Sequence, residues 1–220
     1  MSASFPWLIL VFAGYLVSSN AQENLLPNGT FVGDPPSRGW VTAFPDEAWY
    51  KNNDRWVKFE ANKAPGGHTA LVLNLGPGIA GNQGGKIESH PVKVVPGATY
   101  KIQVDCMTWD FAAKLHAEVW TTDPSPDQKR TLFRRAARAD LPPLIMCYRA
   151  QIPSPPAGAK LWSTAEREFT VPTQVRVAGK DQHPEYISVK AVAYAATMDA
   201  GTSYFANFRL FLVPTKKEKP

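Results

Sequence analysis

The segment TYKIQVDCM, Thr99 to Met107, alternates apolar and polar side chains with a period of two. In an extended chain the apolar side chains fall on one face: Tyr100, Ile102, Val104 and Cys106. The polar side chains fall on the other face: Lys101, Gln103 and Asp105. This period is typical of a half-buried β-strand. The segment therefore predicts a strand whose Cys106 side chain points into a core.

The same pattern recurs along the chain, in short pieces separated by 20 prolines and 15 glycines. Strand-length runs rich in β-branched and aromatic residues are TALVLNL (69–75), KLHAEVWT (114–121), YISVKAVAY (186–194) and SYFANFRLFLV (203–213). Strands of this kind with frequent turns favour an all-β chain folded as a β-sandwich of antiparallel sheets. One stretch departs from the pattern. The periodicity of QKRTLFRRAARA (128–139) predicts a short inserted helix.

The ends of the chain indicate where it resides. Residues 1–21 contain no Asp, Glu, Lys or Arg, hold an apolar run shorter than a bilayer span, and end in Ser-Asn-Ala. This pattern predicts a cleaved signal peptide and a secreted, periplasmic or extracellular protein without stable membrane insertion. Residues 22–214 would form one domain, and the basic residues 215–220 a disordered tail. A net charge of +5 is too small for a dedicated nucleic-acid binder.

The two cysteines, Cys106 and Cys147, would lie in an oxidising compartment after export. We predict that they form a disulfide. Two buried free thiols are the alternative, because sequence does not show whether the two Cβ atoms approach each other.

Several motifs, taken in order, resemble one known family. They are NLLPNGTF (24–31), Gly39-Trp40, VKVVPGATY (92–100), FTVP (169–172) and SYFANFRL (203–210). Together they resemble carbohydrate-binding modules of the family four and nine type, which are galactose-binding-like jelly rolls. The resemblance implies a jelly-roll sandwich, a buried Trp40 and a carbohydrate partner.

The resembled family holds a structural calcium with acidic residues near both ends of the domain. Here the corresponding positions are Thr30, Val32 and Ala206, so that Asp34 is the remaining nearby carboxylate. Calcium needs several oxygen ligands. We therefore predict no cofactor and no metal, with a structural calcium as the alternative.

Candidate ligand-binding residues lie on two successive strands. In KLHAEVWT the side chains of His116, Glu118 and Trp120 share the polar face. If this strand forms a hairpin with the preceding one, Gln103 and Asp105 join them. These side chains, with Trp109 from the connection, suit a sugar, which needs an aromatic platform and placed polar groups. A second candidate is an aromatic loop cluster: Trp49, Tyr50 and Trp56.

The favoured function is therefore a secreted, monomeric, non-catalytic carbohydrate-binding protein that recognises a poly- or oligosaccharide. An enzyme is one alternative. Asp105 and Glu118 on neighbouring strands would lie about 5 Å apart, as in retaining glycosidases, which would suit a glycoside hydrolase or polysaccharide lyase. A structural or adhesive surface protein is another. The four histidines show no zinc-ligand spacing, and no nucleophile elbow or phosphate loop is present.

Overall fold

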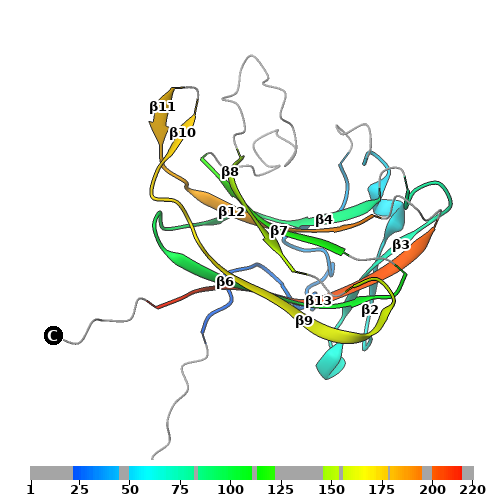
Figure 1. Cartoon of the computed structure of the whole chain (residues 1–220). Helices are drawn as coiled ribbons and strands as arrows, with labels where there is room; N and C mark the ends of the chain where they lie inside the picture. Colours follow the sequence, from blue (N-terminus) through cyan, green and yellow to red (C-terminus); the bar gives the residue numbers. More distant parts are fainter. Residues whose placement is uncertain are drawn as a thin grey trace, which may run out of the picture.

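A computed structural model describes residues 22–44, 50–81, 84–110, 113–121, 146–153, 156–177, 179–194 and 200–214. The chain forms two stacked antiparallel sheets, A and B, with a small β10–β11 hairpin at one end (Figure 1). The predicted signal peptide, the predicted helix at 128–139 and the tail at 215–220 lie outside the described residues.

Sheet A has the strand order β1-β4-β12-β7-β8, and the short strand β5 also pairs with β12. Its strands are β1 (Trp40–Val41), β4 (Gly85–Ser89), β5 (Val92–Lys93), β7 (Ala113–Trp120), β8 (Met146–Ile152) and β12 (Tyr186–Ala193).

Sheet B has the strand order β2-β3-β13-β6-β9. Its strands are β2 (Val57–Glu60), β3 (Ala70–Leu75), β6 (Thr99–Thr108), β9 (Ala159–Thr170) and β13 (Gly201–Leu212). The remaining elements are the 3-10 turns η1 (Asn53–Trp56) and η2 (Pro65–Gly67) and the hairpin strands β10 (Val175–Val177) and β11 (Lys180–Gln182).

The order of these strands is that of a jelly roll. The eight long strands from β3 to β13 alternate between the sheets, and only β7 and β8 follow each other within one sheet. Two interlocked Greek keys produce this pattern. The predicted fold class is confirmed, and the five strands predicted from alternation begin and end within two residues of the observed ones.

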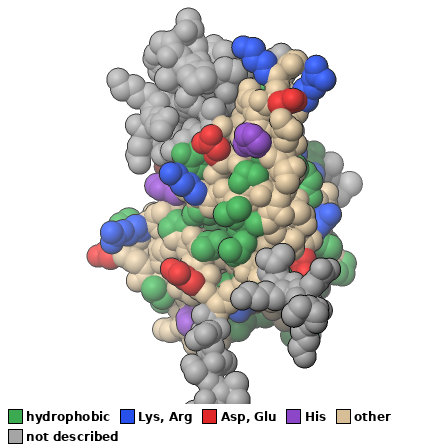
Figure 2. Space-filling model, turned by 90° about the vertical axis from the view of Figure 1, so that its left-hand side faces the viewer, with side chains coloured by type: hydrophobic (Ala, Val, Ile, Leu, Met, Phe, Trp, Pro, Cys, Tyr) green, Lys and Arg blue, Asp and Glu red, His purple; other side chains and the backbone are tan. Residues whose placement is uncertain are grey.

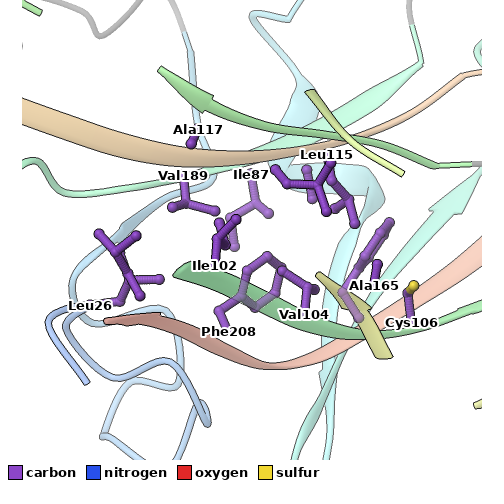
Figure 3. Packing of buried hydrophobic residues seen from close by; sticks show 14 of the residues in the cluster. Leu26, Ile87, Ile102, Val104, Cys106, Leu115, Ala117, Ala165, Val189 and Phe208 are labelled. Carbon is purple, nitrogen blue, oxygen red and sulfur yellow. The ribbon is translucent and has the colours of Figure 1, made fainter. Parts of the chain in front are cut away.

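The core fills the space between the two sheets (Figure 3). Each strand contributes alternate residues, as period-two geometry requires. Sheet A supplies Ile87, Leu115, Ala117, Val119, Ile187, Val189 and Ala191. Sheet B supplies Leu71, Leu73, Ile102, Val104, Cys106, Phe205 and Leu210. The other side of each sheet is consequently left for polar side chains or binding surfaces.

The opening segment is hydrogen-bonded along β13, the central strand of sheet B. The Asn24 amide donates to the Phe208 carbonyl (2.9 Å), and its oxygen accepts from the Leu210 amide (2.9 Å). Trp40 is buried and packs on Phe208 with ring centroids 4.8 Å apart. The buried position that the resemblance implied for Trp40 is confirmed.

Hydrophobic side chains gather near the centre of the view in Figure 2, with side chains of both charges scattered around them. No patch of a single charge dominates the described part of this face. Among the described residues, no helix is both long and apolar enough to cross a membrane.

Candidate functional site

The two strands predicted to form a hairpin lie in different sheets. Strand β6 lies between β13 and β9 in sheet B, and β7 lies between β12 and β8 in sheet A. Consecutive jelly-roll strands cross between sheets, so a short connection here does not make a hairpin. The prediction of one shared face is wrong, and so is the expectation that Asp105 and Glu118 lie about 5 Å apart on neighbouring strands.

The predicted residues are thus divided between two surfaces. Gln103 and Asp105 belong to sheet B, and Trp109 follows directly after β6. The second group, on sheet A, is His116, Glu118 and Trp120. The outer face of sheet A, the side turned away from the core, brings further residues to the second group. Together its polar and aromatic side chains are Lys86, Glu88, His116, Glu118, Trp120, Arg149, Ser188 and Lys190.

Backbone register sets the spacing of this face. Lys190 of β12 pairs with Glu88 of β4 on one side and with His116 of β7 on the other. Glu118 likewise pairs with Ser188 and Arg149 on its two neighbouring strands. Side chains directly opposite each other in a sheet are close enough to interact.

Glu118 is the centre of an ion-pair network on this face. Its Oε1 lies 2.7 Å from Lys190 Nζ and 2.6 Å from Arg149 Nη2. The Glu118 side chain is only 1% exposed and that of Lys190 9%, whereas that of Arg149 is 39% exposed. The Glu118 carboxylate is therefore buried, whereas the Arg149 guanidinium that pairs with it is partly exposed to solvent.

A second chain of contacts runs from Trp120 to Glu88. The Trp120 indole N–H donates to Ser188 Oγ (3.0 Å), whose hydroxyl donates to Glu88 Oε1 (2.6 Å). Burial raises the pKa of Glu88 to about 8, a rise that the neighbouring Glu118 carboxylate increases and that Lys190 opposes. Glu88 is therefore a neutral acid at pH 7, and its Oε2 has no hydrogen-bond partner among the described residues.

His116 has the opposite shift. Burial first, and then the positive charge of Arg149 and Lys190, lowers the pKa of His116 to about 4. The imidazole is neutral at pH 7 and half-buried. Within the described chain its Nδ1 has no hydrogen-bond partner. The face thus offers a neutral ring nitrogen and a neutral carboxylic acid beside fixed charges.

Trp120 does not provide the exposed platform that we predicted. Its side chain lies on the outer face of sheet A, as the alternation indicated. The residue is nevertheless only 5% exposed, and its indole N–H donates to Ser188. Alternation reports the face on which a side chain lies, not what covers it.

Two members of the predicted loop cluster, Tyr50 and Trp56, lie among the described residues. Lys86 Nζ lies 3.9 Å from the centroid of the Tyr50 ring and 4.1 Å from that of Phe44. Trp56 instead packs against the core. Trp49 lies outside the described residues.

On sheet B, Asp105 and Gln103 take part in local networks. Asp105 accepts hydrogen bonds from Thr164 Oγ1 (2.6 Å) and Asn207 Nδ2 (2.7 Å) and is 8% exposed. Gln103 donates to Glu166 (2.7 Å). These bonds join β6 to its two neighbouring strands and account for both side chains without a ligand.

The predicted disulfide is not present, because Cys106 and Cys147 are both free thiols. Cys106 lies in sheet B and Cys147 in sheet A, so the width of the sandwich separates their strands. Each thiol donates instead to a backbone carbonyl, of Ser163 and Val119 respectively. Burial raises the pKa of Cys106 to about 12.

Within the described ranges, no group of three or more His, Cys, Asp or Glu side chains is placed to hold a metal ion. Ala206, which replaces an acidic residue of the resembled family, is fully buried.

Several residues of the outer face of sheet A were missed from sequence. Glu88 alternates with the core residue Ile87, and Lys190 alternates with Val189. The signal was present as a polar residue at every second position of a buried strand. What sequence could not provide was the strand order that brings Glu88, Lys190 and Glu118 together.

No protein family is matched by the sequence, and no curated protein matches it. Solved structures with a similar fold include a family 16 carbohydrate-binding module, at 16% identity and a TM-score of 0.44, with 85% of this chain covering 99% of that one. A family 61 module in complex with β-1,4-galactotriose has 14% identity and a TM-score of 0.44 over 87% and 99% of the two chains.

A third similar structure holds the CBM22-1 and GH10 modules of the Clostridium thermocellum endo-1,4-β-D-xylanase 10B with xylohexaose. Its identity is 10% and its TM-score 0.48 over 87% of this chain. This chain spans only 28% of that xylanase, and 26% of an arabinose-bound α-L-arabinofuranosidase. At identities of 10 to 16% these likenesses concern the fold alone, and their TM-scores carry no argument about a ligand.

Proposed function

We propose that this chain is a secreted, non-catalytic carbohydrate-binding protein that holds a poly- or oligosaccharide on the outer face of sheet A. One observation carries the proposal. The face combines side chains fixed by ion pairs, Glu118 with Lys190 and Arg149, with the unpartnered polar atoms Glu88 Oε2 and His116 Nδ1. Buried polar atoms normally have partners, and their absence in the described chain suits a site that a ligand completes.

The chemistry of these atoms suits a polyhydroxylated ligand. The exposed part of Arg149 offers several N–H donors, and the neutral His116 ring offers an acceptor in one tautomer. The protonated Glu88 is fully buried and lies beneath them. Sugar hydroxyls both donate and accept, so one ring can satisfy groups of both kinds. Because their neighbours hold Glu118 and Arg149 in place, binding costs little side-chain entropy.

Binding is favoured over hydrolysis because the acid and base pair considered from the sequence is divided between the sheets. Glu118 lies between two cations, and Asp105 accepts hydrogen bonds within sheet B. Asp105 and Glu118 therefore do not flank one bond, as glycoside hydrolysis needs. The second carboxyl group near Glu118, that of Glu88, is fully buried. Gel filtration of the exported chain tests the proposed monomer and separates it from the adhesive alternative.

The proposal is tested with β-1,4-galactotriose, cellotriose and xylohexaose, neutral ligands seen in the similar modules. Replacing His116 by alanine is expected to weaken binding about 2- to 10-fold, the value of one net hydrogen bond. Calorimetric titration measures the change. His68→Ala, which removes an exposed histidine elsewhere, serves as the matched control. Equal binding by the wild type and the His116 variant would exclude this face as the site.

We also expect the affinity for carbohydrate to fall at both low and high pH. It should be constant between about pH 5 and 7, because His116 stays neutral above its pKa of about 4 and Glu88 stays protonated below its pKa of about 8. Below pH 4 the imidazole loses its acceptor and gains a charge. Above pH 8 Glu88 gains a negative charge beneath the site. Calorimetric titrations at several pH values measure this dependence. A constant affinity down to pH 3.5 would contradict the role of His116.

A further inference from the structure

Three aromatic rings meet on the outer face of sheet B, on the opposite side of the sandwich from the proposed site. The Tyr204 ring lies 6.3 Å from that of Trp109 and 6.4 Å from that of Trp162, centroid to centroid. Both contacts are edge-to-face, with interplanar angles of 62° and 67°. We call Trp109, Tyr204 and Trp162 the aromatic surface of sheet B.

Strand irregularity and local hydrogen bonds position these rings. The β6–β9 pairing shifts between Cys106 and Thr108, which face Ser163 and Ala159, so β9 has extra residues here. Such bulges redirect side chains. The extra stretch of β9 includes Lys160 and Trp162. After β6, the Thr202 amide donates to Asp110 Oδ2 (2.6 Å), which fixes the turn that carries Trp109.

The aromatic surface of sheet B lies outside the core and is partly exposed to water. Trp109 is 40% exposed, and Leu161, which precedes Trp162 in the chain, is 80% exposed. A large aromatic ring held in place with part of its surface in water is the arrangement that stacks on the apolar side of a pyranose. The core between the sheets, part of which is drawn in Figure 3, is made of other side chains, and these three rings do not belong to it.

The charges around the rings select the ligand class. The Glu60 and Asp110 carboxylates lie near Tyr204 and, after burial, raise its pKa, so the phenol keeps its proton. They would repel uronic acids and sulfated sugars. Lys160 Nζ lies 5.0 Å from the centroid of the Trp109 ring and would repel amino sugars. An uncharged sugar meets neither repulsion, and its hydroxyls can donate to the carboxylates.

We propose that the aromatic surface of sheet B is a second carbohydrate site, which binds neutral pyranosides by stacking on Trp109. Together with the proposed site on sheet A, the chain would hold two glycan segments on opposite faces. This bivalence rests on the proposed function. It could then join two polysaccharide chains without forming a dimer.

The test uses calorimetric titration of the full chain with the neutral β-1,4-linked oligosaccharides of the panel above. The wild type should show two binding events. Trp109→Ala should weaken one of them about 5- to 150-fold, the range found for a nucleic-acid base stacked on an aromatic side chain, and Trp109→Phe should restore part of the loss. Val32→Ala, at an exposed apolar position outside both faces, is the control. Because Trp109 is partly exposed, the melting temperatures should agree.

The outcomes separate the two sites. An event that Trp109→Ala weakens and His116→Ala leaves unchanged supports the second site, whether or not His116→Ala weakens the other event. A single event that His116→Ala weakens and Trp109→Ala does not overturns the second site and leaves the proposed function standing. Wild-type protein that binds none of the panel overturns both.

Discussion

Replacing Glu118 by glutamine is expected to lower the free energy of unfolding by about 3 to 5 kcal/mol. The change removes the carboxylate from between Lys190 Nζ and Arg149 Nη2, which lie 2.7 and 2.6 Å from it, and keeps the side-chain volume. Lys190 has only 9% of its side chain exposed, so water cannot replace the lost charge. Removing one partner of a buried ion pair costs far more than the pair itself contributes.

Urea unfolding measures this cost, which corresponds to a fall in melting temperature of roughly 6 to 20 °C for a domain of this size. The matched control is Glu166→Gln on sheet B. Glu166 forms an ion pair of similar length with Lys101 (3.0 Å), but half of its side chain is exposed. We expect a much smaller loss there, because an exposed ion pair contributes little to stability. Similar losses in the two variants would show that burial does not distinguish these ion pairs.

The strands could be predicted from sequence because their signal is local. The alternation at 99–107 places Ile102 and Val104 in the core and identifies β6 to within one residue. The polar face of β7, with His116 and Glu118, follows from the same period. Each of these predictions needs only the neighbouring residues in the chain.

The partners of each strand could not be predicted in the same way. Strand β6 pairs with β13, about a hundred residues later, and β7 pairs with β12. These pairings are chosen by closure of the whole sandwich, which a short segment does not encode. The error of placing Asp105 beside Glu118 has this origin, and so does the failure to place Cys106 and Cys147 in opposite sheets.

Exposure was the third property that sequence did not reveal. Trp120 and Trp109 stand close together in the chain at the ends of polar strand faces, yet Trp120 is 5% exposed and Trp109 is 40% exposed. The Trp120 indole N–H donates to Ser188 within sheet A, whereas Trp109 lies beyond the end of β6.

Glu88 should respond to glutamine substitution in the opposite way from Glu118, although both lie on the outer face of sheet A. Burial keeps Glu88 protonated in the folded protein up to about pH 8, whereas an unfolded glutamate ionises near 4.5. Between these values the folded protein holds a proton that the unfolded chain releases. Raising the pH therefore favours unfolding, by a total on the order of 5 kcal/mol.

The clearest window lies between pH 6.5 and 8. Below 6.5 the slope from Glu88 is opposed by His116, whose lowered pKa makes stability rise with pH between about 4 and 6.5. Above 6.5 the Glu88 slope remains, and the wild type should lose about 2 kcal/mol by pH 8. Glutamine has no proton to lose, and its amide can still accept from Ser188 and fill the same volume.

The Glu88→Gln protein should therefore have a free energy of unfolding that stays constant over this window and exceeds that of the wild type at pH 8. Urea unfolding at several pH values measures both curves. Glu185→Gln, which changes an exposed carboxylate beside β12, should run parallel to the wild type. If the wild-type and Glu88→Gln curves ran parallel instead, Glu88 would be ionised in the folded protein. The neutral carboxylic acid that we place beneath the sheet A site would then be absent at neutral pH.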